Sequence, residues 1–152
     1  MKKIHVFAAI IGAALLFSYT GFSQVKVQEL RCENLNNPVG LDVLQPRFSW
    51  QLAATQRNVL QTAYELKISR NNTVVWSSGK VNSDSSVHVA YKGQALEPDT
   101  RYSWQVRVWD KDGKPSAWSA PAFFQTALLD KNDWKAQWIS PGFTEDSVNR
   151  PA

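Results

Sequence analysis

This sequence contains few of the residues that usually perform chemistry. Among its 152 residues are one cysteine, Cys32, and two histidines, of which only His88 lies beyond residue 23. A single cysteine cannot form an intrachain disulfide, and a single histidine cannot supply the several ligands of a histidine-based zinc site. We also expect no Ser-His-Asp triad around His88. Stability must therefore come from the burial of apolar side chains, and we expect Cys32 to be simply buried.

Long hydrophobic runs are also missing, apart from one at the N-terminus. Lys2 and Lys3 precede an apolar run over residues 4–17, which is shorter than the roughly 20 residues that a membrane-spanning helix needs. Gly21 and Ser23 are small residues at the −3 and −1 positions of a cleavage site before residue 24. We predict that residues 1–23 are a signal peptide of a periplasmic or extracellular protein with no membrane span after cleavage. An uncleaved membrane anchor is the weaker alternative.

The sequence has no concentrated charge of either sign. The formal net charge of +4 arises from 17 basic and 13 acidic residues, and two of the lysines belong to the predicted signal peptide. The basic residues are scattered along the chain, and no run of Lys or Arg follows one surface. This pattern argues against a nucleic-acid partner.

The strongest structural signal is the alternation of side chains after Leu96. Pro98 lies in a corner that precedes Tyr102, an arrangement typical of the tyrosine corner of immunoglobulin-like sandwiches. From there the alternation predicts a half-buried antiparallel strand whose inward residues are Tyr102, Trp104, Val106 and Val108, and whose outward residues are Ser103, Gln105, Arg107 and Trp109. Asp112-Gly113 predicts a turn, and a further strand follows through Ala122, Phe124 and Thr126.

Further short strands are predicted along residues 25–91. The apolar phase slips near Gln28-Glu29, which predicts a bulge or kink in the first strand. The next inward faces are Phe48, Trp50 and Leu52, then Tyr64, Leu66 and Ile68, a short strand at Val74 to Trp76, and a fifth with Val87, Val89 and Tyr91. No amphipathic helix is visible after the signal peptide. We therefore predict an all-β, immunoglobulin-like (fibronectin type III-like) antiparallel β-sandwich of about seven strands.

The domain boundary falls near residue 128, where the alternation stops. We assign residues 24–128 to the β-sandwich. Residues 129–152 are expected to be a linker and the truncated start of a second β-sandwich domain, because so short a segment cannot bury Trp134 and Trp138 by itself.

Several motifs together resemble a known family. They are LRCENLNNPVGLD, PRFSW, QTAYEL, WSSGKV, YSWQVRVWDKDGKPSAWS, FFQTALL and WKAQWI, in this order between Val25 and Ile139. They resemble the N-terminal region of bacterial α-L-rhamnosidases of glycoside hydrolase family 78. The resemblance implies a fibronectin-like module, then β-sandwich domains, and far downstream an (α/α)6 barrel that hydrolyses terminal α-L-rhamnose from glycosides with inversion. No position here matches the family's catalytic motifs.

The acidic residues do not suggest a catalytic pair. Inverting hydrolysis needs two carboxyl groups about 6.5–9.5 Å apart with room for a water. Turn chemistry already accounts for Asp110 and Asp112, and Glu65, Glu97 and Asp99 fall on outward faces or at turns. We predict no catalytic, cofactor-binding or metal-binding residue in this chain.

The seven tryptophans raise the question of carbohydrate binding. Trp50 and Trp104 face inward, whereas the orientation of Trp76 stays open. The residues predicted to form interdomain or carbohydrate contacts are Trp109, Phe123, Trp134 and Trp138, and packing against a neighbouring domain is the preferred interpretation. Trp118, in Ser-Ala-Trp-Ser, is expected to stack with Arg101 or Arg107 in a structural cation–π contact.

The leading functional hypothesis is a non-catalytic N-terminal accessory module of an exported α-L-rhamnosidase-like hydrolase. Its expected partners are downstream domains of the same polypeptide and, through the parent enzyme, rhamnose-containing glycans. A stand-alone fibronectin-like adhesion or carbohydrate-binding module is the alternative.

Overall fold

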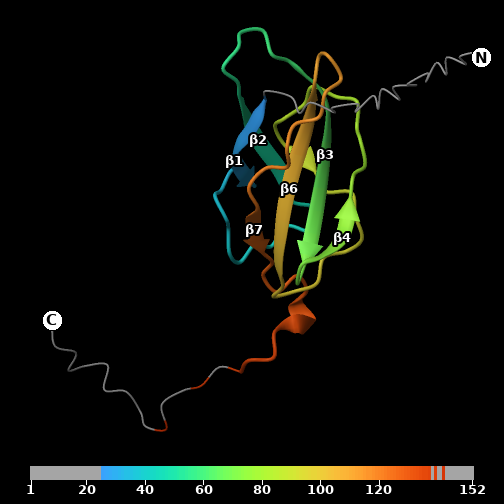
Figure 1. Cartoon of the computed structure of the whole chain (residues 1–152). Helices are drawn as coiled ribbons and strands as arrows, with labels where there is room; N and C mark the ends of the chain where they lie inside the picture. Colours follow the sequence, from blue (N-terminus) through green and yellow to red (C-terminus); the bar gives the residue numbers. More distant parts are fainter. Residues whose placement is uncertain (1–24, 138, 140–141, 143–152) are drawn as a thin grey trace, which may run out of the picture.

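The computed structural model describes residues 25–137, 139 and 142, so the predicted signal peptide lies outside the described part (Figure 1). The described residues form seven strands and one short 3₁₀ helix, and no α-helix. The strands are β1 (Lys26–Cys32), β2 (Arg47–Ala53), β3 (Gln61–Arg70), β4 (Thr73–Ser77), β5 (Val89–Ala90), β6 (Arg101–Asp110) and β7 (Ala122–Gln125), and the helix is η1 (Lys131–Asp133).

The strands form two antiparallel sheets that pack face to face (Figure 1). One sheet has the order β1-β2-β5 and the other β4-β3-β6-β7. Strands β3 and β6 pair along nearly their whole length, from Gln61 opposite Asp110 to Ser69 opposite Ser103. The predicted all-β, immunoglobulin-like sandwich is thereby confirmed. No helix in the described residues is long and apolar enough to cross a membrane.

Aromatic rings from both sheets fill the space between them. The Phe48 ring on β2 lies 4.6 Å from that of Trp104 on β6 and 5.7 Å from that of Phe124 on β7. Tyr102 stacks on Phe124 with ring centroids 5.3 Å apart. Phe48, Trp104 and Phe124 are at most 1% exposed. The inward phase predicted for β6 and β7 is therefore correct.

The predicted tyrosine corner is present at the start of β6. The Tyr102 hydroxyl accepts a hydrogen bond from the Glu97 backbone N–H at 3.0 Å, five residues upstream. The corner is also tied to the end of β7, since the Thr126 hydroxyl donates to the Glu97 carbonyl at 2.7 Å. The polar groups of this turn are thus satisfied although Tyr102 and Thr126 are buried.

The predicted irregularity in the first strand is also present. The pairing of β1 with β2 shifts register between Gln28 and Arg31, and Glu29 has φ 51°. Side chains on either side of this bulge, Val27 and Cys32, both face the core. A bulge changes the phase of a strand by one residue, which explains why the apolar positions switch from odd to even.

The fifth strand is shorter than predicted. Only Val89 and Ala90 pair with β2, whereas Val87 is 63% exposed and lies outside the strand. His88, with φ 53°, interrupts the extended backbone between Val87 and Val89. Alternation across a residue in the left-handed region does not keep side chains on one face, and the inward assignment of Val87 was wrong.

Candidate functional site

The carboxylate of Asp110, the last residue of β6, has structural partners. One oxygen of Asp110, Oδ1, accepts hydrogen bonds from the backbone N–H groups of Asp112 at 3.0 Å and Lys114 at 2.9 Å. The Asp110 backbone carbonyl in turn accepts from Gly113, whose φ is 74°. Asp110 thus closes the hairpin turn, as the sequence predicts.

Other acidic side chains are also engaged in contacts that hold the fold. Glu97 forms an ion pair with Arg70, and Asp99 accepts a hydrogen bond from the Gln125 side chain at 3.0 Å. Glu33 is held by Arg47, whose hydrogen bonds lower the pKa of that carboxyl. The described residues contain no group of three or more His, Cys, Asp and Glu side chains that could hold a metal ion.

Cys32 is buried, as predicted, with 1% exposure. Desolvation, followed by the charge of Glu33, raises the pKa of the Cys32 thiol to about 12. The thiol is therefore protonated at neutral pH and is no nucleophile.

Alternating cations and aromatic rings cover the outer surface of the four-stranded sheet. Lys67 Nζ lies 4.1 Å and the Arg107 guanidinium 4.8 Å from the Trp118 ring. Arg107 also lies 5.0 Å from the Trp109 ring, and Lys80 Nζ lies 4.8 Å from that ring. We call Lys67, Trp118, Arg107, Trp109 and Lys80 the outer-face ladder. It contains the predicted stack of Arg107 and Trp118.

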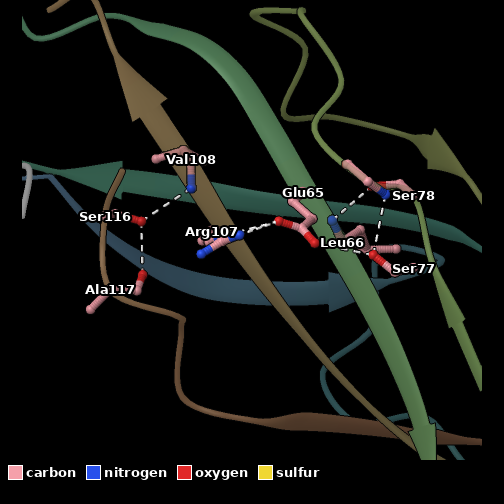
Figure 2. A network of polar contacts seen from close by, with 9 residues as sticks. Glu65, Leu66, Ser77, Ser78, Arg107, Val108, Ser116 and Ala117 are labelled. Atoms are coloured by element: carbon pink, nitrogen blue, oxygen red, sulfur yellow. Dashed lines mark hydrogen bonds and ion pairs between the residues drawn. The ribbon is translucent and has the colours of Figure 1, made fainter. Parts of the chain in front are cut away.

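Glu65 fixes the central arginine of the outer-face ladder (Figure 2). Glu65 Oε2 accepts from Arg107 Nε at 2.8 Å and lies 2.7 Å from Arg107 Nη2, while Oε1 accepts from the Ser77 hydroxyl at 3.2 Å. Three strands, β3, β4 and β6, are joined by these contacts (Figure 2). Arg107 is 34% and Glu65 17% exposed, so solvent screens this pair only in part.

Serine hydroxyls replace missing strand partners on both sides of the pair formed by Glu65 and Arg107 (Figure 2). The Ser116 hydroxyl accepts from the Val108 N–H at 3.1 Å and donates to the Ala117 carbonyl at 2.8 Å. The Ser78 hydroxyl accepts from the Leu66 N–H at 2.9 Å. These contacts assign the Ser-Ala-Trp-Ser segment a structural role beside β6.

Arg101, the other arginine expected beside Trp118, contacts a different ring. Its guanidinium lies 3.6 Å from the Phe123 ring. The register explains this contact, because Arg101 pairs with Gln125 and Ser103 with Phe123, which makes Arg101 and Phe123 diagonal neighbours. The alternative of a stack between Arg101 and Trp118 was wrong.

The predicted contact residues that lie in the described part differ in their exposure. Trp109 is only 9% exposed, so the exposed apolar area expected there is absent. Lys80 and Arg107 lie over its ring, and its backbone is bridged to Pro115. Phe123 is half-buried beneath Arg101, Trp134 is 62% exposed, and Trp138 lies outside the described residues. The end of β6, which contains Trp109, and η1, which directly precedes Trp134, lie at opposite ends of the sandwich (Figure 1).

Hydrogen bonds hold the segment after β7, where the chain leaves the sandwich. Ala127 donates its N–H to the Leu41 carbonyl at 2.8 Å, and its own carbonyl accepts from Asp99 at 3.0 Å. Leu129 packs against the core, and Asp130 and Asp133 cap η1 reciprocally. Three exposed apolar side chains lie in this segment or in the loop that is hydrogen-bonded to it: Val39 (69%), Leu128 (42%) and Trp134 (62%). We call these three residues the exit pole.

A groove opens on the side of the sandwich between edge strands β4 and β5. Its volume is about 510 Å³. We call it the side groove; it is lined by Tyr64, Trp76, Ser77, Ser78, Val81, Ser83, Ser85, Val87, His88, Val89, Ala90 and Lys92. Burial raises the pKa of Tyr64, whose hydroxyl is therefore a neutral donor at physiological pH.

The sequence analysis did not identify this groove. Its signals were the run Trp76-Ser77-Ser78 and the serines near residue 85, which combine an aromatic ring with several hydroxyls. Strand alternation carries no information about how an irregular segment folds back between two sheets.

Two antiparallel sheets, a tyrosine corner and structurally engaged carboxylates define the class as an immunoglobulin-like β-sandwich. Within that class, the family described as Rha78A-like, N-terminal immunoglobulin domain matches residues 27–130. The chain belongs to this family.

Relatives with known names are much longer than this chain. It is 43% identical over 123 residues to an alpha-L-rhamnosidase of Streptomyces avermitilis, a match covering 78% of this chain and 12% of the relative. It is 39% identical over 113 residues to an alpha-L-rhamnosidase of Formosa agariphila, covering 69% and 12%. The chain thus spans only 12% of the length of either relative.

Solved structures of alpha-L-rhamnosidases also match this chain over a small part of their length. The crystal structure of the Streptomyces avermitilis alpha-L-rhamnosidase complexed with L-rhamnose matches with TM-score 0.73 and 43% identity, over 76% of this chain and 12% of that chain. The alpha-L-rhamnosidase from Dictyoglumus thermophilum matches with TM-score 0.71 and 38% identity, over 76% and 14%.

Proposed function

We propose that this domain is a non-catalytic N-terminal accessory module of an α-L-rhamnosidase-like glycoside hydrolase. The parent enzyme would release terminal α-L-rhamnose from glycosides with inversion, using carboxylates in a downstream (α/α)6 barrel. The observation that carries the proposal is the family match over residues 27–130, together with relatives in which the matched part is 12% of the length.

Two carboxylates that are held in structural contacts support a non-catalytic role. Asp110 is committed to its turn, and Glu65 is held between Arg107 and Ser77. Inverting hydrolysis requires one carboxylic acid that protonates the leaving group and one carboxylate that activates water. Moving either carboxylate to such a role would break contacts that hold a turn or join strands.

The exit pole supports a docking role toward the domain that follows in the polypeptide. Its apolar side chains stand beside the outgoing chain, and η1 is capped rather than frayed. A rigid exit reduces the orientational freedom that is lost when two domains pack together. We therefore assign Val39, Leu128 and Trp134 to that interface. The predicted contacts of Phe123 and Trp138 remain part of this proposal, whereas Trp109 is too covered to contribute much.

Export to the periplasm or beyond is the proposed localisation. It is supported by Lys2 and Lys3, the apolar run of residues 4–17, and the small residues Gly21 and Ser23. N-terminal sequencing of the secreted protein is expected to begin at residue 24. A mature protein that begins at Met1 would contradict export through a cleaved signal.

The genomic reading frame tests the accessory role directly. We expect the codons after Ala152 to continue into β-sandwich domains and then an (α/α)6 barrel with a pair of acidic catalytic residues. A genuine stop codon directly after Ala152 would contradict the accessory role and favour a stand-alone module.

A further inference from the structure

The side groove has the size and position of a ligand site. It lies between β4 and β5, the edge strands of the two sheets, and the irregular segment of residues 78–88 forms one of its walls. Its volume of about 510 Å³ is within the range of small-molecule sites, about 300–1,000 Å³.

A buried glutamine holds this wall in place. Gln61 is 6% exposed, and its Nε2 donates to the carbonyls of Ser83 at 3.1 Å and Ser85 at 2.9 Å. Its Oε1 accepts from the Trp50 indole N–H at 3.1 Å. Both amide hydrogens and the carbonyl of Gln61 are therefore used to attach an irregular segment to the core.

Further backbone contacts fix the same segment. Val81 and Tyr64 exchange hydrogen bonds of 2.8 and 2.9 Å, and the Trp50 N–H donates to the Ser86 carbonyl at 2.9 Å. The His88 N–H donates to the Ser49 hydroxyl at 3.0 Å. Since the backbone is held at these points, the side chains lining the groove are presented in fixed positions. Preorganisation of this kind lowers the entropic cost of binding a ligand.

The lining combines aromatic rings with hydroxyl groups. Trp76 is half-buried, and an edge contact with Tyr91, at 5.0 Å and 71°, fixes its ring plane. Tyr64 provides a second ring, and Ser83 and Ser85 provide hydroxyls. The hydroxyls of Ser77 and Ser78 also line the groove, but they are already bonded within the protein. A pyranose ring has a matching surface, because its C–H faces are apolar and its rim carries hydroxyl groups that donate and accept hydrogen bonds.

From this combination we propose that the side groove binds one pyranose unit of a glycan, with the sugar ring against Trp76 and its hydroxyls toward Ser83 and Ser85. No Asp or Glu is among the described residues that line the groove, so the bound sugar is held and not hydrolysed. This inference goes beyond the accessory role, which requires no ligand.

The experiment is a titration of the isotope-labelled protein with methyl glycosides of the common neutral pyranoses, cellobiose and maltose, followed by the amide NMR signals. We expect at least one sugar to cause saturable shifts over residues 76–90 with a dissociation constant in the millimolar range. Trp76→Ala and the double variant Ser83→Ala/Ser85→Ala are expected to weaken that binding by about tenfold or more.

Two further variants keep the result interpretable. Trp76→Phe retains a ring with less risk to the fold, and is expected to bind between the wild type and the alanine variant. Trp118→Ala, on the outer-face ladder, is expected to bind normally. Absence of saturable shifts in the groove for every sugar, or equal binding by the Ser83/Ser85 variant, would overturn the inference. Either result would leave the accessory role untouched, because that role is tested by the reading frame.

Discussion

Trp50 and Tyr102 each combine a buried ring with one polar group that has a specific partner. Trp50 donates its indole N–H to Gln61, and the Tyr102 hydroxyl accepts from the Glu97 N–H. Both residues are at most 3% exposed. Leaving a buried polar group without its partner costs more than the net strength of the hydrogen bond itself, so these contacts help to select one arrangement of the core.

The corner bond of Tyr102 is measurable by removing one atom. Tyr102→Phe keeps the stack on Phe124 and is expected to lower the free energy of unfolding by about 1 kcal/mol. Tyr64→Phe is the matched control and is expected to cost clearly less, because Tyr64 is only half-buried. Urea denaturation of both variants gives the values. Equal effects for the two variants would contradict the corner assignment.

Loss of the Trp50 ring is expected to be severe. Trp50→Ala removes a fully packed side chain and is expected to cost about 3–5 kcal/mol of unfolding free energy. It also leaves Gln61 Oε1 without its donor. The measurement is the urea midpoint with an unchanged slope. A midpoint equal to that of the wild type would mean that Trp50 does not pack in the core.

Cys32 is expected to resist alkylation in the native state. Its pKa, raised to about 12 by burial, leaves almost no thiolate at pH 8, whereas the unfolded chain has an ordinary thiol pKa. Iodoacetamide labelling followed by mass spectrometry is expected to be slow in buffer and fast in urea. The same shift makes the free energy of unfolding depend on pH. The contribution of the protonated Cys32 thiol to this free energy is complete below pH 9 and is lost as the pH rises toward 12, because the unfolded chain ionises first. Rapid native labelling at pH 8 would contradict the burial of this thiol.

At the level of elements, β6 organises the four-stranded sheet on both of its faces. Its inward residues form the core with Phe48 and Phe124, while outward Arg107 lies between the rings of Trp109 and Trp118. The Arg107 guanidinium also donates to the carboxylate of Glu65 on β3. The outer-face ladder therefore adds cohesion on a surface that would otherwise be solvated.

Arg107 and Trp118 are expected to be energetically coupled by about 0.5–1 kcal/mol. A double-mutant cycle with Arg107→Ala and Trp118→Ala measures this coupling and removes the separate contribution of Glu65. Arg101→Ala with Trp118→Ala is the control cycle, and is expected to be additive because Arg101 lies over Phe123. Strict additivity in the first cycle would exclude the stack.

The alternation of apolar and polar residues predicted the strands that have one face in the core and the other face toward solvent. In β6 and β7 the inward residues are more deeply buried than most of the outward ones, so both strands were located and their phases were correct. In β1 the phase slip itself located the bulge. Alternation failed at Val87, because the positive φ of His88 is a property of the loop and not of the apolar pattern.

For the whole molecule, the fold was predictable and the surfaces were not. Outward phase placed Trp109 correctly on the outer face, but its coverage depends on Lys80, which is 29 positions earlier in the sequence and arrives from the segment after β4. The side groove depends in the same way on Gln61 reaching Ser83 and Ser85. Such contacts between distant segments determine what a surface offers, and they leave no periodic signal in the sequence.

The central proposal is that this domain is a non-catalytic part of a glycoside hydrolase. The most direct measurement is the release of 4-nitrophenol from 4-nitrophenyl α-L-rhamnopyranoside by the highly purified 152-residue protein. We predict a rate equal to the buffer background, because Asp110 and Glu65 are committed to structural contacts. Turnover above background that disappears in Asp110→Asn or Asp112→Asn would contradict the account and locate an active site in the turn after β6.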